Sequence, residues 1–148
     1  MKYLKTILLA GFISGSLDAA AAILFYAKSY ELHNMGLVFR YIAKGILGKG
    51  AYSAGVIYPL IGLILHYLIS TIWSIFYFSF LSKSFRSGFL WIKMPVLAAL
   101  IWIVMNAIVM PIFGFSNAHY DGWSILKSFL ILLVCVSAPI VIITEKVK

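Results

Sequence analysis

The sequence predicts an all-α membrane protein with four transmembrane helices and an interfacial amphipathic helix between spans 1 and 2. Of its 148 residues, 64% are hydrophobic and only 11% are charged, whereas about a quarter of the residues of a soluble domain carry charge. The apolar residues form four runs of about 20 residues or more, enough to cross about 30 Å of hydrocarbon. The cations lie almost entirely between and beside these runs, as topology-setting cations do. We therefore expect a single membrane domain covering residues 1–148.

The first span is expected at about residues 6–27. Four of its residues follow one another at offsets of four, three and four along one helical stripe: Gly11, Gly15, Asp18 and Ala22. Small residues on one stripe allow close packing with another helix, so Gly11 and Gly15 are predicted packing positions and Asp18 should face protein. The basic and then apolar N-terminus also resembles a cleaved signal peptide, and cleavage would leave three spans.

The segment at about residues 36–48 is too short to span a bilayer. Arg40 and Lys44 are four residues apart and share one face of a helix, while apolar residues lie largely on another. This pattern predicts an amphipathic helix in the plane of the interface, with Arg40, Lys44 and Lys49 contacting lipid head groups. A re-entrant segment is the alternative, although it needs protein on both sides to cover its backbone.

The second span is expected at about residues 54–80, a run with no Asp, Glu, Lys or Arg. Its less apolar residues again share a single stripe, at offsets of four, three, four, four and three: Gly55, Pro59, Gly62, His66, Ser70 and Trp73. Gly55 and Gly62 are predicted helix-packing positions. Pro59 lacks a backbone donor and is expected to kink the first turns.

The third and fourth spans are expected at about residues 94–113 and 125–144. Pro95 is predicted to stand in the first turn of the third span, where its missing donor has no cost. Four spans place both termini on the same side of the membrane. Seven Lys and Arg residues accompany the termini and five lie opposite, which favours cytoplasmic termini.

Polar residues near the middle of the spans form a predicted intramembrane site: Asp18, His66, Ser70, Asn106 and Cys135. An Asp at the centre of a membrane helix is normally paired, protonated or functional. His66 lies near the middle of the neighbouring, antiparallel span, so we predict contact between Asp18 and His66, directly or through water. Hydrogen-bonded helix packing, a proton relay or substrate site, and a metal or haem site all remain open.

Signatures of enzymes are missing from the sequence. It contains no HExxH, no pair of carboxylates on one span and no Gly-rich phosphate loop. We therefore expect a protein that is not an enzyme, with no catalytic residue, metal or cofactor. The excess of 12 Lys and Arg over 4 Asp and Glu favours contact with anionic lipid head groups rather than nucleic acid.

Two stretches carry a resemblance to a known group of proteins: GFISGSLDAAAA, at residues 11–22, and GKGAYSAGVIYPLIGLILHYLIS, at residues 48–70. They resemble small, uncharacterised four-span proteins of the bacterial inner membrane. That group has an Asp in the first span and a Gly-x-x-x-His step in the second, matched here by Asp18, Gly62 and His66. The resemblance implies the membrane class and the inner-membrane location, and it implies no activity.

These observations favour an accessory or structural subunit of a larger bacterial membrane assembly, in contact with other membrane subunits or with further copies of itself. The alternative is a small proton-coupled transporter or carrier that acts as a homodimer and uses Asp18 and His66. A haem- or quinone-associated electron-transfer subunit is the third hypothesis.

Overall fold

The computed structural model describes residues 2–27, 31–84, 89–115 and 121–146, and within these ranges it contains helices and no strands. Four of its helices are long and apolar enough to cross a membrane: Tyr3–Tyr26, Ile57–Leu81, Leu90–Ile112 and Gly122–Glu145. A further helix, α2 (Leu32–Leu47), follows the first of these. The structure thus has a helix at each of the five positions predicted from the sequence.

The first long helix is a single α-helix, α1 (Lys2–Tyr26), and the other three are each interrupted by a π-helical turn. The α-helical pieces of these three are α3 (Ile57–Phe76), α4 (Ser82–Ser84), α5 (Leu90–Ile103), α6 (Met110–Ile112), α7 (Gly122–Ile131) and α8 (Ala138–Glu145). The π-helical turns that join them are η2 (Tyr77–Leu81), η3 (Val104–Val109) and η4 (Leu132–Ser137). A short 3-10 helix, η1 (Gly48–Tyr52), connects α2 toward α3.

Three details of the second and third helices differ from the sequence predictions. Gly55 precedes α3 and has φ of 127°, so it is a loop residue and its predicted role in helix packing is wrong. Pro59 lies in the first turn of α3, where backbone donors have no helical partner, so nothing requires the predicted kink. The third helix begins at Leu90, which places Pro95 inside the helix instead of in its first turn.

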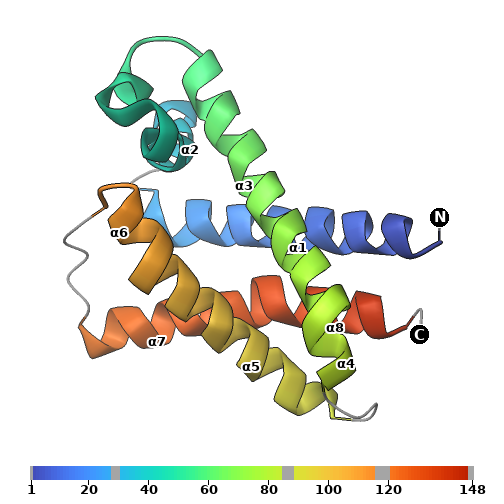
Figure 1. Ribbon diagram of the computed structural model, residues 1–148. Coiled ribbons are helices and arrows are strands. Elements are labelled where there is room, and N and C mark those ends of the chain that lie inside the picture. The colour runs from blue at the N-terminus through green and yellow to red at the C-terminus, as the bar shows by residue number, and fades with distance from the viewer. Residues whose placement is uncertain (1, 28–30, 85–88, 116–120, 147–148) are drawn as a thin grey trace.

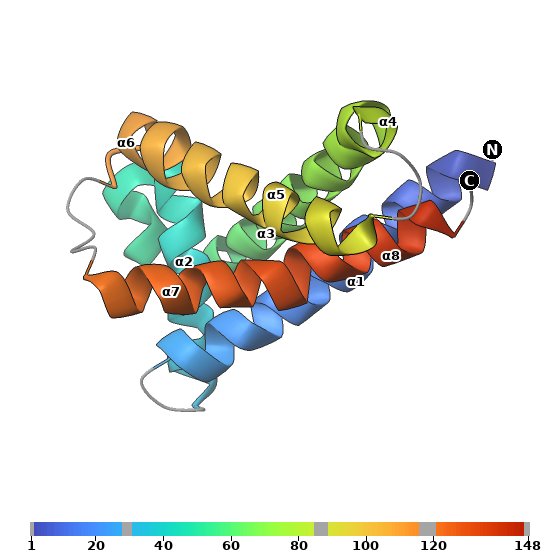
Figure 2. The same ribbon diagram turned by 90° about the horizontal axis from the view of Figure 1, so that it is seen from below.

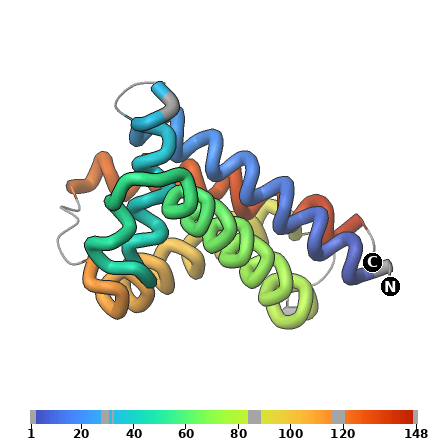
Figure 3. The backbone as a smooth tube through the Cα atoms, turned by 90° about the horizontal axis from the view of Figure 1, so that it is seen from above, coloured from blue at the N-terminus to red at the C-terminus, as the bar shows by residue number. Residues whose placement is uncertain are grey.

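The four long helices form an open bundle (Figures 1 and 2). α1 packs against α3 on one side and against η4 and α8 on the other, and α5 packs against η4. α3 and the third helix are close at η2 and diverge from there, and α2 lies across the open end, opposite the two termini (Figures 1 and 3). Both described ends of the chain therefore lie at the same end of the bundle.

The hydrophobic core lies toward the end of the bundle that carries the termini. Its buried residues come from η2, α5, η4 and α8: Tyr77, Leu97, Ile101, Val136, Ile140 and Val141. Many other large apolar side chains are exposed, as expected of helices that face lipid.

Glycines set how closely α3 approaches α1 and α2. A Cβ atom added at Gly62 would lie 1.8 Å from the backbone oxygen of Phe39 in α2, and one added at Gly11 would lie 2.8 Å from the Cα of Thr71 in α3. At Gly15 it would lie 2.8 Å from the ring of Tyr67. Gly11, Gly15 and Gly62 are therefore close-packing positions, as predicted.

We predict that Gly62→Ala destabilises the protein. The added methyl group meets a backbone carbonyl, which cannot move aside alone, so α2 must separate from α3, at a cost of about 1–3 kcal/mol or more. Thermal unfolding in detergent measures the effect. Gly122→Ala is the matched control, because no atom lies within 4 Å of a Cβ added there. Equal melting temperatures for the two variants would contradict the close contact.

Candidate functional site

The buried face of the second long helix is polar. The buried residues of α3 and η2, in order along the helix, are Gly62, His66, Ser70, Ser74 and Tyr77. Their offsets of four, four, four and three place them on a single face, which is turned toward the interior of the bundle. The last four of these residues are called the α3 polar row below. The helix is therefore polar inside and apolar outside, the reverse of a helix in a soluble protein.

His66 is the first residue of this row. Its side chain is 10% exposed, and its Nε2–H donates to the backbone oxygen of Gly15 at 2.9 Å. The same Nε2 atom lies 3.9 Å from a carboxylate oxygen of Asp18. The predicted proximity of Asp18 and His66 is thus confirmed. The closeness of Asp18 and His66 depends on Gly15, because a glycine leaves room for the side chains of Tyr67 and Ser70 beside α1.

Asp18 has a quarter of its side chain exposed, so it is less enclosed than its histidine partner. Cys135, in η4, is close enough to Asp18 to interact with it electrostatically. Asn106 lies on η3, and its side-chain amide donates to the carbonyl of Trp102 in the preceding turn at 2.8 Å. Of the predicted polar residues, the structure therefore brings Asp18, His66 and Ser70 together around Gly15, with Cys135 nearby.

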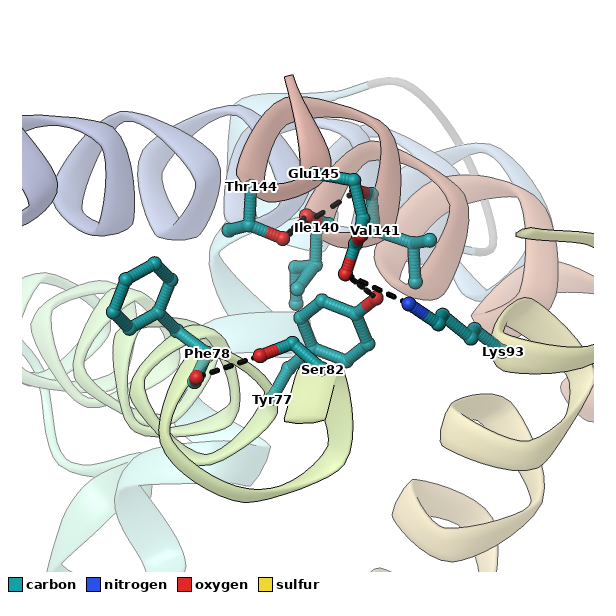
Figure 4. Close-up of polar contacts among 8 residues, drawn as sticks. All are labelled: Tyr77, Phe78, Ser82, Lys93, Ile140, Val141, Thr144 and Glu145. Atoms are coloured by element: carbon teal, nitrogen blue, oxygen red, sulfur yellow. Dashed lines mark hydrogen bonds and ion pairs between the residues drawn. The ribbon is translucent and has the colours of Figure 1, made fainter. Parts of the chain in front are cut away.

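A second buried polar cluster lies at the other end of the row, around Tyr77 (Figure 4). Nζ of Lys93 is 3.0 Å from a carboxylate oxygen of Glu145, and the hydroxyl of Tyr77 donates to the same oxygen at 2.9 Å. Lys93 and Tyr77 are fully buried, and the Glu145 side chain is 12% exposed. The cluster joins η2, α5 and α8, three of the four elements that build the hydrophobic core.

The sequence predictions did not include this cluster, because Lys93 and Glu145 lie just outside the spans expected at residues 94–113 and 125–144. A signal for it was present. In antiparallel spans, the start of the third lies beside the end of the fourth, and Lys93 and Glu145 are oppositely charged residues at those two positions. A charge held within apolar helices needs a partner, so the opposite charges are expected to pair.

Between the two clusters, hydroxyl groups are bonded to backbone oxygens of neighbouring helices. Ser74 donates to the carbonyl of Ile7 in α1 at 2.9 Å, and Ser137 donates to that of Met94 in α5 at 2.5 Å. Among the described residues, no buried side-chain nitrogen or oxygen lacks a hydrogen-bond partner. The interior polar groups therefore satisfy one another within this one chain.

The three cations predicted to contact lipid head groups have different surroundings. Arg40 donates to the backbone oxygens of Ala51, Ser53 and Gly55, so its guanidinium holds the turn that leads into α3. Lys44 lies over the ring of Phe115, 5.0 Å from the ring centre, while Lys49 lies on the exposed 3-10 turn η1.

No known protein family, curated protein or solved structure matches this chain. Within the described part of the chain, no group of three or more His, Cys, Asp and Glu side chains could hold a metal ion.

We predict that Lys93→Met lowers stability by about 3–5 kcal/mol, because it leaves the carboxylate of Glu145 buried without its cation. The double variant Lys93→Met/Glu145→Gln should recover much of this loss, since a neutral amide still accepts the hydroxyl of Tyr77. Melting temperatures in detergent compare the two. If the double variant were no more stable than the single one, the pair would not be the cause.

Proposed function

We propose that this protein is a multi-pass protein of the bacterial inner membrane, inserted through its four apolar helices. Each of these helices has between 23 and 25 residues, more than the roughly 20 needed to cross the hydrocarbon. α2 lies across one end of the bundle (Figure 3), an orientation that suits a helix in the plane of the interface. Both ends of the chain are proposed to be cytoplasmic. Of the cations counted for this orientation, Arg86 and Lys148 on the side of the termini and Lys28 on the opposite side lie outside the described residues.

Within that membrane, the best-supported role is that of an accessory or structural subunit of a larger assembly. The observation that carries this proposal is the internal satisfaction of the buried polar groups among the described residues. A substrate site normally presents polar groups toward the ligand, whereas these groups are bonded to the chain's own helices. The apolar outer faces of the four helices offer surface for neighbouring membrane subunits.

Gentle purification of the tagged protein from its native membrane, followed by mass analysis of intact particles, tests this proposal. We expect a stoichiometric partner protein that is absent from a parallel preparation of an unrelated four-span protein with the same tag. Recovery of a lone monomer at native expression would contradict the accessory role.

A second function, proton-coupled transport, is favoured by the two ionisable clusters and the row between them. Asp18 and His66 lie at one end of the α3 polar row, and Tyr77, Lys93 and Glu145 lie at the other. Carboxylate and imidazole groups carry protons through membranes in pumps and transporters. The serine hydroxyls between the clusters, with bridging water, provide groups along which a proton could pass.

For this second function we predict that Asp18→Asn abolishes proton flux in reconstituted vesicles, because an amide, unlike a carboxylate, does not take up and release a proton at physiological pH. Flux is followed with a pH-sensitive dye under an imposed gradient. Asp121→Asn is the matched control, since Asp121 is exposed and precedes α7. Unchanged flux in Asp18→Asn, or equal loss in the control, would rule out a proton path through Asp18.

A further inference from the structure

An apolar groove lies where α3 and the third long helix diverge. It has a volume of about 400 Å³ and is lined by residues of α2, α3, η3 and α6, together with Phe113 and Phe115 just beyond α6. On α3 the lining extends from Leu65 to Trp73, which corresponds to about 12 Å along a helix axis. The groove therefore runs from α2, at one end of the bundle, along α3 toward the hydrophobic core.

The chemistry of this lining limits what can occupy the groove. Its side chains are aliphatic or aromatic, and no charged residue is among those that line it. Such a surface offers apolar contact along its length and few hydrogen bonds, so the part of an occupant that lies inside should be hydrocarbon.

A cation, Lys44, lies beside the end of the groove where α2 forms the lining. Nζ of Lys44 is 5.0 Å from the ring centre of Phe115 and 6.0 Å from that of Tyr41, and both rings line the groove. Arg40, one turn earlier, directs its guanidinium at three backbone oxygens of the chain itself. Lys44 is thus the member of this pair whose charge lies against the groove.

We propose that the groove binds one acyl chain of an anionic phospholipid, whose phosphate is held by Lys44. The hydrocarbon lies along α3, and the negative head group meets the lysine at the α2 end, so both parts of the lipid have a complementary surface. This inference rests on the proposed insertion in the membrane. It adds a specific lipid site that a general attraction of basic residues to the membrane surface does not require.

Native mass spectrometry of the intact protein in detergent tests the site, with phosphatidylglycerol and phosphatidylcholine of identical acyl chains as probes. We expect one molecule of phosphatidylglycerol to bind in preference to phosphatidylcholine. Lys44→Gln should weaken phosphatidylglycerol binding about fivefold, the size expected of one lysine near a phosphate. Lys83→Gln removes the same charge from an exposed position on α4, which does not line the groove, and should leave binding unchanged.

Filling the groove tests the acyl-chain half of the inference. Gly45 lines the groove, and a Cβ added there lies 3.4 Å from the ring of Phe115, so Gly45→Leu should reduce binding of both lipids. Ile46→Trp is a second filling variant. Because Ile46 is 62% exposed, a larger side chain there leaves the fold intact.

Three results would overturn the inference: full lipid binding in both filling variants, no change in Lys44→Gln, or equal weakening in Lys83→Gln. Adducts with the mass of a protein or a quinone in place of a phospholipid would also overturn it. Alkaline extraction of membranes separates this failure from failure of the proposed insertion. A protein that stays in the membrane and shows no specific lipid adduct contradicts only the groove site, whereas a protein that is extracted contradicts insertion.

Discussion

The close contact between α1 and α3 is the constraint on which the rest of the arrangement depends. In the proposed bilayer, apolar helices gain little from burying apolar surface against one another, so their association relies on van der Waals contact and hydrogen bonds between them. Gly11 and Gly15 supply that contact by allowing Thr71 and Tyr67 to approach the backbone of α1. The same absence of a side chain exposes the carbonyl of Gly15 to His66. Because α1 also packs against η4 and α8, the position of the fourth helix follows from that of the first.

The helices and the central polar pair could be predicted from the sequence because each depends on a local or symmetric property. Length and hydropathy fix the four long helices, and the separation of charged and apolar faces indicates α2. Asp18 and His66 could be paired because both lie near the middle of consecutive, antiparallel spans. Gly11, Gly15 and Gly62 could be identified because small residues recur on their stripes.

The remaining features depend on how turns and non-consecutive helices meet. The partners of Arg40 are backbone oxygens of the turn before α3, and a sequence does not show where carbonyls point. Gly55 continues the periodicity of the second span, yet the helix starts two residues later. Asn106 is near the middle of its span like Asp18, but π-helical turns and the divergence of α3 from the third helix decide which polar residues meet.

The pairing of Lys93 with Glu145 also constrains the order in which the helices assemble during synthesis of the protein. The two residues are separated by 52 positions, and Glu145 belongs to the last turn of α8. In the membrane insertion proposed above, the third helix enters the bilayer before the partner of its lysine has been synthesised. In that interval the long side chain can extend to the head groups, and arrival of the fourth helix then draws it inward. Synthesis of α8 thus supplies the carboxylate that closes this end of the bundle.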